Sequence, residues 1–217
     1  MDAEPFIRPY QPSDRSDVAD ICVRTAHNGQ DSTSLYPDIE LMPSIFSHPY
    51  LHLEPDLARV LDDGRGRAVG YIIGTADTAR FVRRFRAEWL PEVADRYPRP
   101  TQEPRDPTEE MTVLLHDPER MVRPELDPFP AHLHIDLLPQ WQRRGFGRAL
   151  MDSFLAVLRA KDVPAVHLCM VRANTRARAF YDRLGFREIA VPDPGPVWYL
   201  GRSTAPGVPV PAAGNTR

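Results

Sequence analysis

Two apolar runs in the second half of the chain are each followed by a segment with helical periodicity. Residues 131–138 form the first run, and residues 147–160 follow it with apolar side chains at helical spacing. A second β-rich run, at residues 166–171, precedes a predicted helix that begins at Asn174. The pattern therefore predicts two consecutive strand–helix units.

The rest of the chain supplies shorter elements. Hydrophobic spacing and turn residues predict, in order, strand 6–9, helix 14–26, short helix 38–46, a hairpin of strands 57–61 and 68–75, a helix over 78–97 kinked near Pro91, short helix 108–115, and closing strands 187–191 and 197–200. Together these elements predict an α/β (α+β) fold, in which a mixed central sheet is flanked by helices on both faces.

Length and composition favour one domain. The chain has 217 residues, of which 42% are hydrophobic and 26% charged, as is typical of a soluble globular protein. We expect a single domain over residues 1–201 with a long insertion at about 77–130. The proline-rich part of that insertion, 98–130, is predicted to be a surface excursion. The Gly, Pro, Ala and Thr content of residues 202–217 favours a disordered tail.

The hexapeptide at 142–147, between a predicted strand and a predicted helix, carries two glycines. A turn that opens a helix presents backbone N–H groups without intrahelical acceptors, and the helix dipole adds partial positive charge. Glycine also lets a phosphate approach closely, because it has no Cβ. The turn therefore predicts a site for a phosphate-bearing ligand. Glycines chosen only for turn geometry explain the hexapeptide alone equally well, since it matches neither a P-loop nor the dinucleotide fingerprint.

Charge and cysteine content exclude several other classes. The net charge of −3 gives no reason to expect nucleic-acid binding. No stretch approaches the ~20 apolar residues of a membrane span, and no basic-then-apolar leader opens the chain, so we expect no membrane contact and a cytoplasmic location. Cys22 and Cys169 lack metal-ligand spacing, so we expect buried free thiols and no metal.

Two linked motifs make the chain resemble the GNAT (general N-acetyltransferase) superfamily. Residues 142–147 follow the order Q-x-x-G-x-G, and residues 174–186 follow the order N-x-x-A-x-x-x-Y-x-x-x-G-F. The resemblance implies the GNAT fold, with a sheet that is splayed between its middle strands, 131–138 and 166–171. It also implies acetyl-CoA as the cofactor and transfer of acetyl to an amine.

Residues 36–200 show a narrower resemblance, to the acetyltransferase-like C-terminal domain of O-GlcNAcase and its stand-alone bacterial relatives. The segments that carry it are 49–57, 69–78, 81–84, 89–91 and 96–98. The domain in O-GlcNAcase is regarded as a pseudo-acetyltransferase with a degraded cofactor turn, whereas this chain keeps the complete turn and Tyr181. We therefore expect an active enzyme, with a non-catalytic acetyl-CoA-binding module as the alternative.

The superfamily resemblance also implies where the cofactor lies. Its pyrophosphate is expected on the N–H groups of residues 143–147, and its pantetheine arm between the splayed strands, against the backbone of Leu137 and Leu138. A backbone N–H in that region is expected to polarise the thioester carbonyl. The cofactor-binding residues expected in this way are Leu137, Leu138, Gln142, Arg143, Arg144, Gly145, Phe146, Gly147, Arg148, Asn174 and Ala177.

Catalysis by such a site needs an acid and a base. By the resemblance, Tyr181 is the expected general acid for the leaving thiolate, although a core tyrosine is the alternative. His132, His134 and Asp136 alternate along the central strand and so share one face, which makes them candidates for the base. We prefer Asp136, which is nearest to the cofactor turn, and rank His134 second. A purely structural role stays open for each of the three.

The acceptor is the least determined part of the site. Asp31 belongs to a polar segment at residues 25–33, after the first predicted helix, and in this fold that loop lies near the acceptor. We expect Asp31 to bind substrate, although a turn with helix caps explains the segment as well. The expected partner is a small-molecule or protein amine, and the expected assembly is a monomer or homodimer.

Overall fold

A sheet of seven strands runs through residues 4–207, the part of the chain that the computed structural model describes. The strands are β1 Phe6–Pro9, β2 Arg59–Asp62, β3 Ala68–Thr75, β4 Ala131–Leu137, β5 Ala165–Val171, β6 Arg187–Ile189 and β7 Val197–Ser203. Their order in the sheet is β1-β2-β3-β4-β5-β7-β6. The β4–β5 pair is parallel and the other neighbours are antiparallel, which confirms the predicted mixed sheet.

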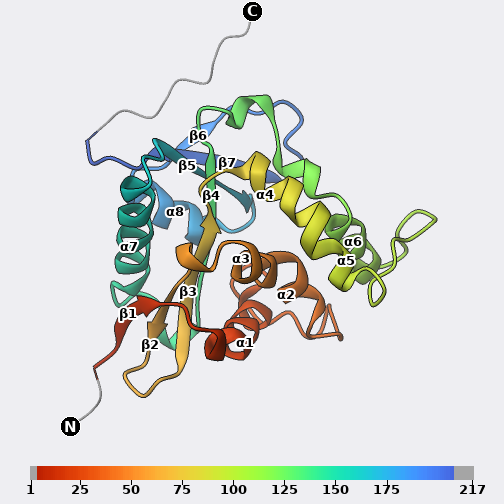
Figure 1. Ribbon diagram of the computed structural model, residues 1–217, viewed down its shortest axis with the longest axis horizontal. Helices are drawn as coiled ribbons and strands as arrows, with labels where there is room; N and C mark the ends of the chain where they lie inside the picture. The colour runs from red at the N-terminus through yellow and green to blue at the C-terminus, as the bar shows by residue number, and fades with distance from the viewer. Residues whose placement is uncertain (1–3, 208–217) are drawn as a thin grey trace, which may run out of the picture.

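Helices cover both faces of this sheet, as predicted. The α-helices are α1 Arg15–Thr25, α2 Leu41–Phe46, α3 His48–Leu53, α4 Thr78–Arg84, α5 Leu90–Val93, α6 Pro107–Leu115, α7 Phe146–Ala160 and α8 Thr175–Arg183. Helix α7 packs on β2, β3 and β4, whereas α1 packs on β3 and β4. Figure 1 shows α7 on one side of β3 and β4, and α1 to α3 on the other side.

Side chains of β4 alternate between these two helical layers. Gly74 of β3 pairs with Leu133 of β4 and lies under α7, so Leu133 and every second residue of β4 face α7. The other set, His132, His134 and Asp136, faces the layer of α1 to α3. The predicted shared face of these three residues is therefore confirmed.

The predicted kink near Pro91 is present as a π-helical turn. Residues Phe85–Trp89 form this turn between α4 and α5, and the N–H of Leu90 donates to the carbonyl of Phe85. Proline has no N–H to continue the α-helical ladder, so the chain leaves regular α-helix geometry next to it.

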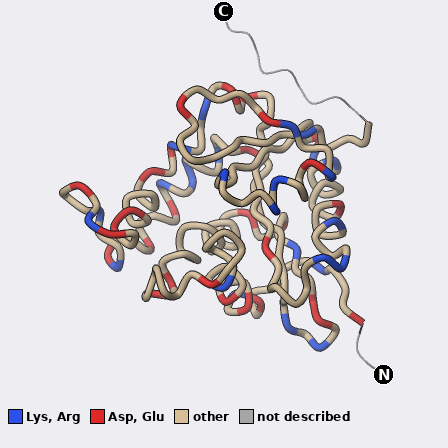
Figure 2. Tube along the Cα trace, turned by 180° about the vertical axis from the view of Figure 1, so that it is seen from behind, with Lys and Arg blue, Asp and Glu red and all other residues tan. Residues whose placement is uncertain are grey.

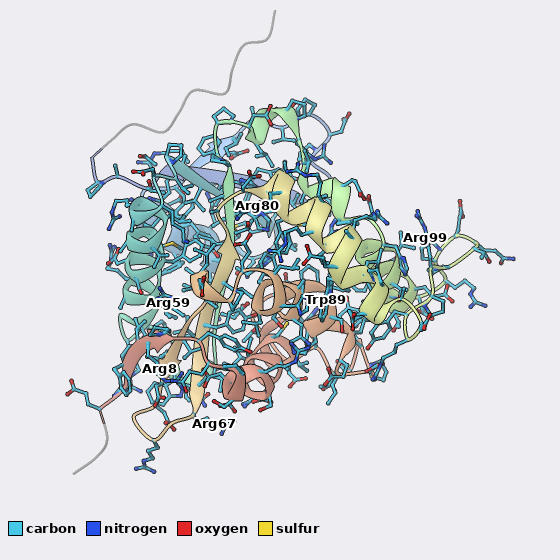
Figure 3. All side chains as sticks on the ribbon, in the orientation of Figure 1. Arg8, Arg59, Arg67, Arg80, Trp89 and Arg99 are labelled. Carbon is cyan, nitrogen blue, oxygen red and sulfur yellow. The ribbon has the colours of Figure 1, made fainter. Side chains whose placement is uncertain are left out.

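The insertion between β3 and β4 is folded into the molecule. Besides α4 to α6 it contains the 3-10 turns η4 Pro118–Met121 and η5 Pro124–Leu126. Trp89, Tyr97 and Leu115 are buried in the main hydrophobic core, and Trp89 Nε1 donates to the carbonyl of Ser44 at 2.9 Å. Figure 3 labels Trp89 where the insertion meets α2 and α3. Within the predicted surface excursion at 98–130, residues 101–107 are exposed, whereas Leu115, Leu126 and Phe129 are buried, because scattered apolar residues can pack without a regular period.

The C-terminal boundary lies later than predicted. Strand β7 continues to Ser203, which pairs with Ala165 of β5. Thr204 is also buried, and its hydroxyl donates to the carbonyl of Val163 at 2.7 Å. These residues belong to the domain and not to a tail, because main-chain pairing holds them. Residues 208–217 of the predicted tail lie outside the described residues.

We predict that Gly74→Ala destabilises the fold strongly, because there is no room for a methyl group under α7. An added Cβ would lie 2.2 Å from the carbonyl oxygen of His132 and 2.7 Å from Cζ of Phe154. A main-chain oxygen cannot swing aside, so we expect a loss of about 3 kcal/mol in the free energy of unfolding, measured in urea.

Gly66→Ala is the control for this substitution. Gly66 has a φ of +90° but no atom within 4 Å of an added Cβ. Backbone strain alone should therefore lower the free energy of unfolding of Gly66→Ala, by about 1 kcal/mol. Equal losses in the two variants would contradict the close packing of β3 under α7.

Candidate active site

The two central strands separate soon after they meet. β4 and β5 are paired only at Ala131↔Val166 and His132↔His167, whereas β5 stays paired with β7 from Ala165 to Val171. Cys169 is exposed and Val171 is 44% exposed, although both lie on an interior strand. The predicted splay is therefore present, and the prediction of a buried thiol was right for Cys22 and wrong for Cys169.

The register of β4 determines which main-chain groups face the gap. The N–H of Leu138 donates to the carbonyl of Val69 at 3.0 Å, so Leu138 points its N–H toward the β3 side. Hydrogen-bonding direction alternates along an antiparallel ladder, which turns the main-chain groups of Ile135 and Leu137 toward β5. Past the last β4–β5 pair, those groups line the gap.

This register shows which of the expected main-chain groups are free to donate into the gap. The N–H of Leu138 is occupied by Val69, and its carbonyl accepts from the N–H of Trp141 at 2.8 Å, so Leu138 has no main-chain donor to offer. Leu137 keeps its N–H, although its carbonyl accepts from Nε2 of Gln142 at 2.8 Å. Ile135, which sequence reasoning missed, is the second donor that faces the gap. The alternation of main-chain direction along β4, counted back two residues from Leu137, could have predicted that Ile135 faces the gap.

Beyond the gap, the glycine turn opens helix α7. Arg143 has a φ of 59° and Gly145 a φ of 88°, and this left-handed backbone turns the chain into the helix at Phe146. Within the described part of the chain, the main-chain N–H groups of residues 143–148 have no protein acceptor. No atom lies within 4 Å of a Cβ built at Gly145. The turn thus has the free donors and the open space that a diphosphate requires.

Side chains around the turn hold its shape. The guanidinium of Arg144 lies 4.9 Å from the ring centre of Trp141 and 5.4 Å from that of Phe146. Arg148 donates to the carbonyl of Arg183 in α8 at 3.3 Å. A Cβ at Gly147 would come within 3.2 Å of the Phe180 ring, so the start of α7 packs directly against α8.

Helix α8 brings the second motif to this place. Asn174 Oδ1 accepts from the N–H of Ala177 at 3.1 Å, so Asn174 caps the helix, and Ala177 packs against the core. Tyr181 is buried against Phe180 and Phe186, whose ring centres lie 5.2 and 5.5 Å away. Burial raises the pKa of Tyr181 above its usual value, and the nearby charge of Asp136 adds to the shift. The phenol therefore stays protonated at neutral pH and lies within electrostatic reach of Asp136.

Asp136 and His134 differ in their capacity to accept a proton. The hydroxyl of Tyr71 donates to Oδ2 of Asp136 at 2.8 Å. Burial raises the pKa of Asp136 to about 6, although this hydrogen bond acts in the other direction. Burial and the charge of Arg120 lower the pKa of His134 to about 4. Two pKa units correspond to a ~100-fold difference in basicity, so Asp136 is the stronger proton acceptor.

A buried hydrogen-bond chain fixes the protons of the histidines. Thr78 Oγ1 lies 2.8 Å from both the carbonyl oxygen of Pro130 and Nδ1 of His132. Because a carbonyl can only accept, the pattern assigns the Thr78 proton to Pro130 and a donating Nδ1–H to His132. The Tyr50 hydroxyl then donates to His132 Nε2 at 2.7 Å and accepts from His134 Nε2 at 3.1 Å. Nδ1 of His134 is left as an unprotonated acceptor.

The structure does not bring Asp31 together with these residues. Its Oδ1 accepts from the N–H of Thr33 at 2.9 Å and from the Thr33 hydroxyl, and these bonds lower the pKa of Asp31. Among the described residues, the hydrogen bonds of the Asp31 carboxylate go to Thr33 and none goes to β4. Substrate binding by Asp31 stays a prediction, and the local turn accounts for its position.

Neither of two cavities on the described surface is lined by a residue of β4. One, of about 590 Å³, lies at the start of α1 and includes Tyr10, Arg15 and Arg59. The other, of about 420 Å³, follows the β6–β7 connection and begins at Tyr199. Free main-chain donors and titratable side chains, rather than cavity size, therefore place the candidate active site at the β4–β5 gap.

Comparison with known proteins shows the family. The acetyltransferase (GNAT) family matches residues 30–186, most of the chain. This chain belongs to the acetyltransferase (GNAT) family. Acetyltransferases of this family use acetyl-CoA, and the GNAT fold of this chain confirms the resemblance drawn from the two motifs. The free donors of residues 143–148 and the β4–β5 gap fit the diphosphate and the amide-bearing arm of that cofactor.

Three relatives illustrate this membership. Protein O-GlcNAcase of Rattus norvegicus is 29% identical over 202 residues, which cover 91% of this chain but 22% of that protein. The chain therefore spans about a fifth of the length of this relative. The solved structure of SsHAT is 65% identical, with a TM-score of 0.91 over 93% of this chain and 99% of that chain. PaiA N-acetyltransferase of Thermoplasma acidophilum, solved with coenzyme A, shares the fold at 12% identity and a TM-score of 0.55, over 92% of this chain and 99% of that chain.

No helix within residues 4–207 is both long enough and apolar enough to cross a bilayer. Figure 2 shows Lys and Arg interspersed with Asp and Glu along the trace. The small negative net charge agrees with this mixture.

We predict that Gly145→Val weakens coenzyme A binding about 100-fold, because its side chain fills the space beside the free N–H groups and several charge-assisted hydrogen bonds are lost. Isothermal titration calorimetry with coenzyme A measures the effect. Gly66→Val is a matched control, since Gly66 has a φ of +90° and the same open surroundings but lies far along the chain from the turn. Unchanged affinity in Gly145→Val would place the diphosphate elsewhere.

Proposed function

We propose that the protein acetylates a primary amine by direct attack on the thioester, with Asp136 as general base and Tyr181 as general acid. The observation that carries the proposal is the placement of these two groups. Asp136 lies on the strand that borders the gap, its pKa is raised to about 6, and Tyr181 is near enough for the charge of Asp136 to raise the pKa of its phenol. An acid and a base with such different pKa values are what acyl transfer to an amine requires.

When bound, acetyl-CoA supplies an activated acyl group. The N–H groups of Ile135 and Leu137 face the gap, where they can hold an amide-bearing arm in place of the missing strand pairing. Asp136 is ionised at neutral pH and takes one proton from the attacking amine. Tyr181 keeps its phenolic proton, because its pKa is raised, and gives it to the departing thiolate sulfur.

The acceptor approaches from the layer of α1 to α3. His132, His134 and Asp136 face this layer, whereas α7 covers the opposite face. The amine therefore meets Asp136 and the free Nδ1 of His134 before it reaches the gap. A small-molecule amine and a protein amine both remain compatible with this arrangement.

We predict that the rate falls tenfold for each pH unit below about pH 6, because only ionised Asp136 accepts a proton. Above its pKa the carboxylate is ionised, so kcat should level off as the pH rises.

Tyr71→Phe removes the hydrogen bond that lowers the pKa of Asp136, so this variant should shift the acid limb of the pH–rate profile to higher pH. Asp136→Asn should lower kcat about 100-fold. An acid limb that does not move in Tyr71→Phe would exclude Asp136 as the base.

We predict that Tyr181→Phe lowers kcat about 100-fold and leaves coenzyme A affinity unchanged, since the variant removes only the proton donor. Steady-state kinetics and calorimetry measure the two quantities separately. Phe180→Leu, a neighbouring aromatic replacement without a titrating group, controls for changed packing of α8. If turnover survives in Tyr181→Phe, Tyr181 has no part in the proton transfer.

A further inference from the structure

The segment that contains η4 and η5 crosses the acceptor face of the sheet. At one end of the crossing, Met121 Sδ lies 4.0 Å from the hydroxyl of Tyr50. At the other end, the guanidinium of Arg123 lies 5.8 Å from the ring centre of Tyr199. Tyr50 contacts the histidines of β4, and Tyr199 stands opposite Cys169 of β5. Residues 121–123 therefore span both sides of the β4–β5 gap.

This crossing lies over the place where the strands part. The last parallel pair is His132↔His167, so His134 and Cys169 are the next residues on the same face. Tyr50 binds His134 there, and Cys169 is exposed to solvent. Arg123 lies against Tyr199, and Arg120 is near enough to Tyr50 and Cys169 for them to affect its pKa, so both arginines stand beside this opening.

Neither arginine has a counter-ion in the described part of the chain, where no carboxylate oxygen lies within 4.0 Å of them. Arg120 Nη1 donates only to the carbonyls of Leu114 and Asp117, at 2.7 and 2.6 Å. Nε of Arg123 is buried without any hydrogen-bond partner. Burial of a cation without a counter-ion is costly, and burial lowers the pKa of Arg120 accordingly.

We propose that Arg120 and Arg123 bind an anionic group of the acceptor, so that the preferred substrate is a primary amine that also carries a carboxylate or a phosphate. Guanidinium groups suit these planar or multidentate anions, and the bound anion supplies the missing partner of Arg123 Nε. The inference rests on the proposed function, because it assumes that an amine enters from this face.

Matched pairs of amines test the charge preference in the wild-type enzyme. β-Alanine and β-alaninamide differ by a carboxylate, and O-phosphoethanolamine and ethanolamine differ by a phosphate. We expect kcat/KM with acetyl-CoA to be about 10- to 100-fold higher for at least one anionic member than for its neutral partner. The two pairs also distinguish carboxylate from phosphate. Equal or higher values for both neutral members would overturn the proposal.

Charge-removing variants locate the preference. Arg123→Gln and Arg120→Gln should raise KM for the anionic amine about 10- to 100-fold and leave the neutral amine unchanged. Arg99→Gln is the matched control, since it removes the same charge from an exposed loop of the same insertion, which projects away from the sheet in Figure 3. A preference that persists in both Arg120→Gln and Arg123→Gln, or that is lost equally in Arg99→Gln, contradicts the assignment.

A binding measurement separates this inference from the proposed function. The side-chain Nε–H resonance of Arg123 can be followed by NMR while β-alanine, O-phosphoethanolamine or ethanolamine is added in the presence of coenzyme A. The resonance should move with an anionic amine and not with ethanolamine, whether or not any amine is acetylated. If the anionic amines shift the Arg123 resonance and no product forms, the proposed catalysis is contradicted and the anion site stands. If product forms and neither anionic amine shifts the Arg123 resonance, the anion site is contradicted and the proposed catalysis stands.

Discussion

β4 and β5 are paired at two register positions and then separate, and the candidate active site depends on this separation. Unpaired main-chain groups inside a sheet need partners, which makes the gap a place for an amide-bearing ligand. β3 supports β4 and β7 supports β5 along their outer sides, so the sheet stays continuous on either side of the opening. The contact of Gly147 with Phe180 then places the start of α7 beside α8 at the end of the gap.

The sheet also divides the chemistry between its two faces. The glycine turn presents free N–H groups and the positive end of the α7 dipole, which suit an anionic ligand. The α1-side face carries Asp136, His134 and their buried partners, whose pKa values are shifted mainly by burial. Burial away from water thus raises the pKa of the Asp136 carboxyl toward neutral pH and keeps the His134 imidazole neutral.

The insertion between β3 and β4 adds side chains to the family fold beside the β4–β5 gap. The family match and the SsHAT structure concern the shared framework. Tyr50, Met121, Arg120 and Arg123 come from the first half of the chain or from the insertion, and they meet over the gap. Substrate choice on a shared fold is set by such added segments, because loops change without disturbing the sheet.

The sequence by itself determined the strands, the long helices, the glycine turn and the helix that carries Tyr181, because each follows from a local period or a local backbone requirement. It did not determine the main-chain direction of Leu138 and Ile135, which depends on pairing with β3, or the burial of the insertion on α2 and α3. The Tyr50–His134 and Tyr71–Asp136 contacts join residues 84 and 65 positions apart. Only the tertiary structure decided which polar groups lost water and which met a partner, since burial and proximity are properties of the packed chain and not of any one segment.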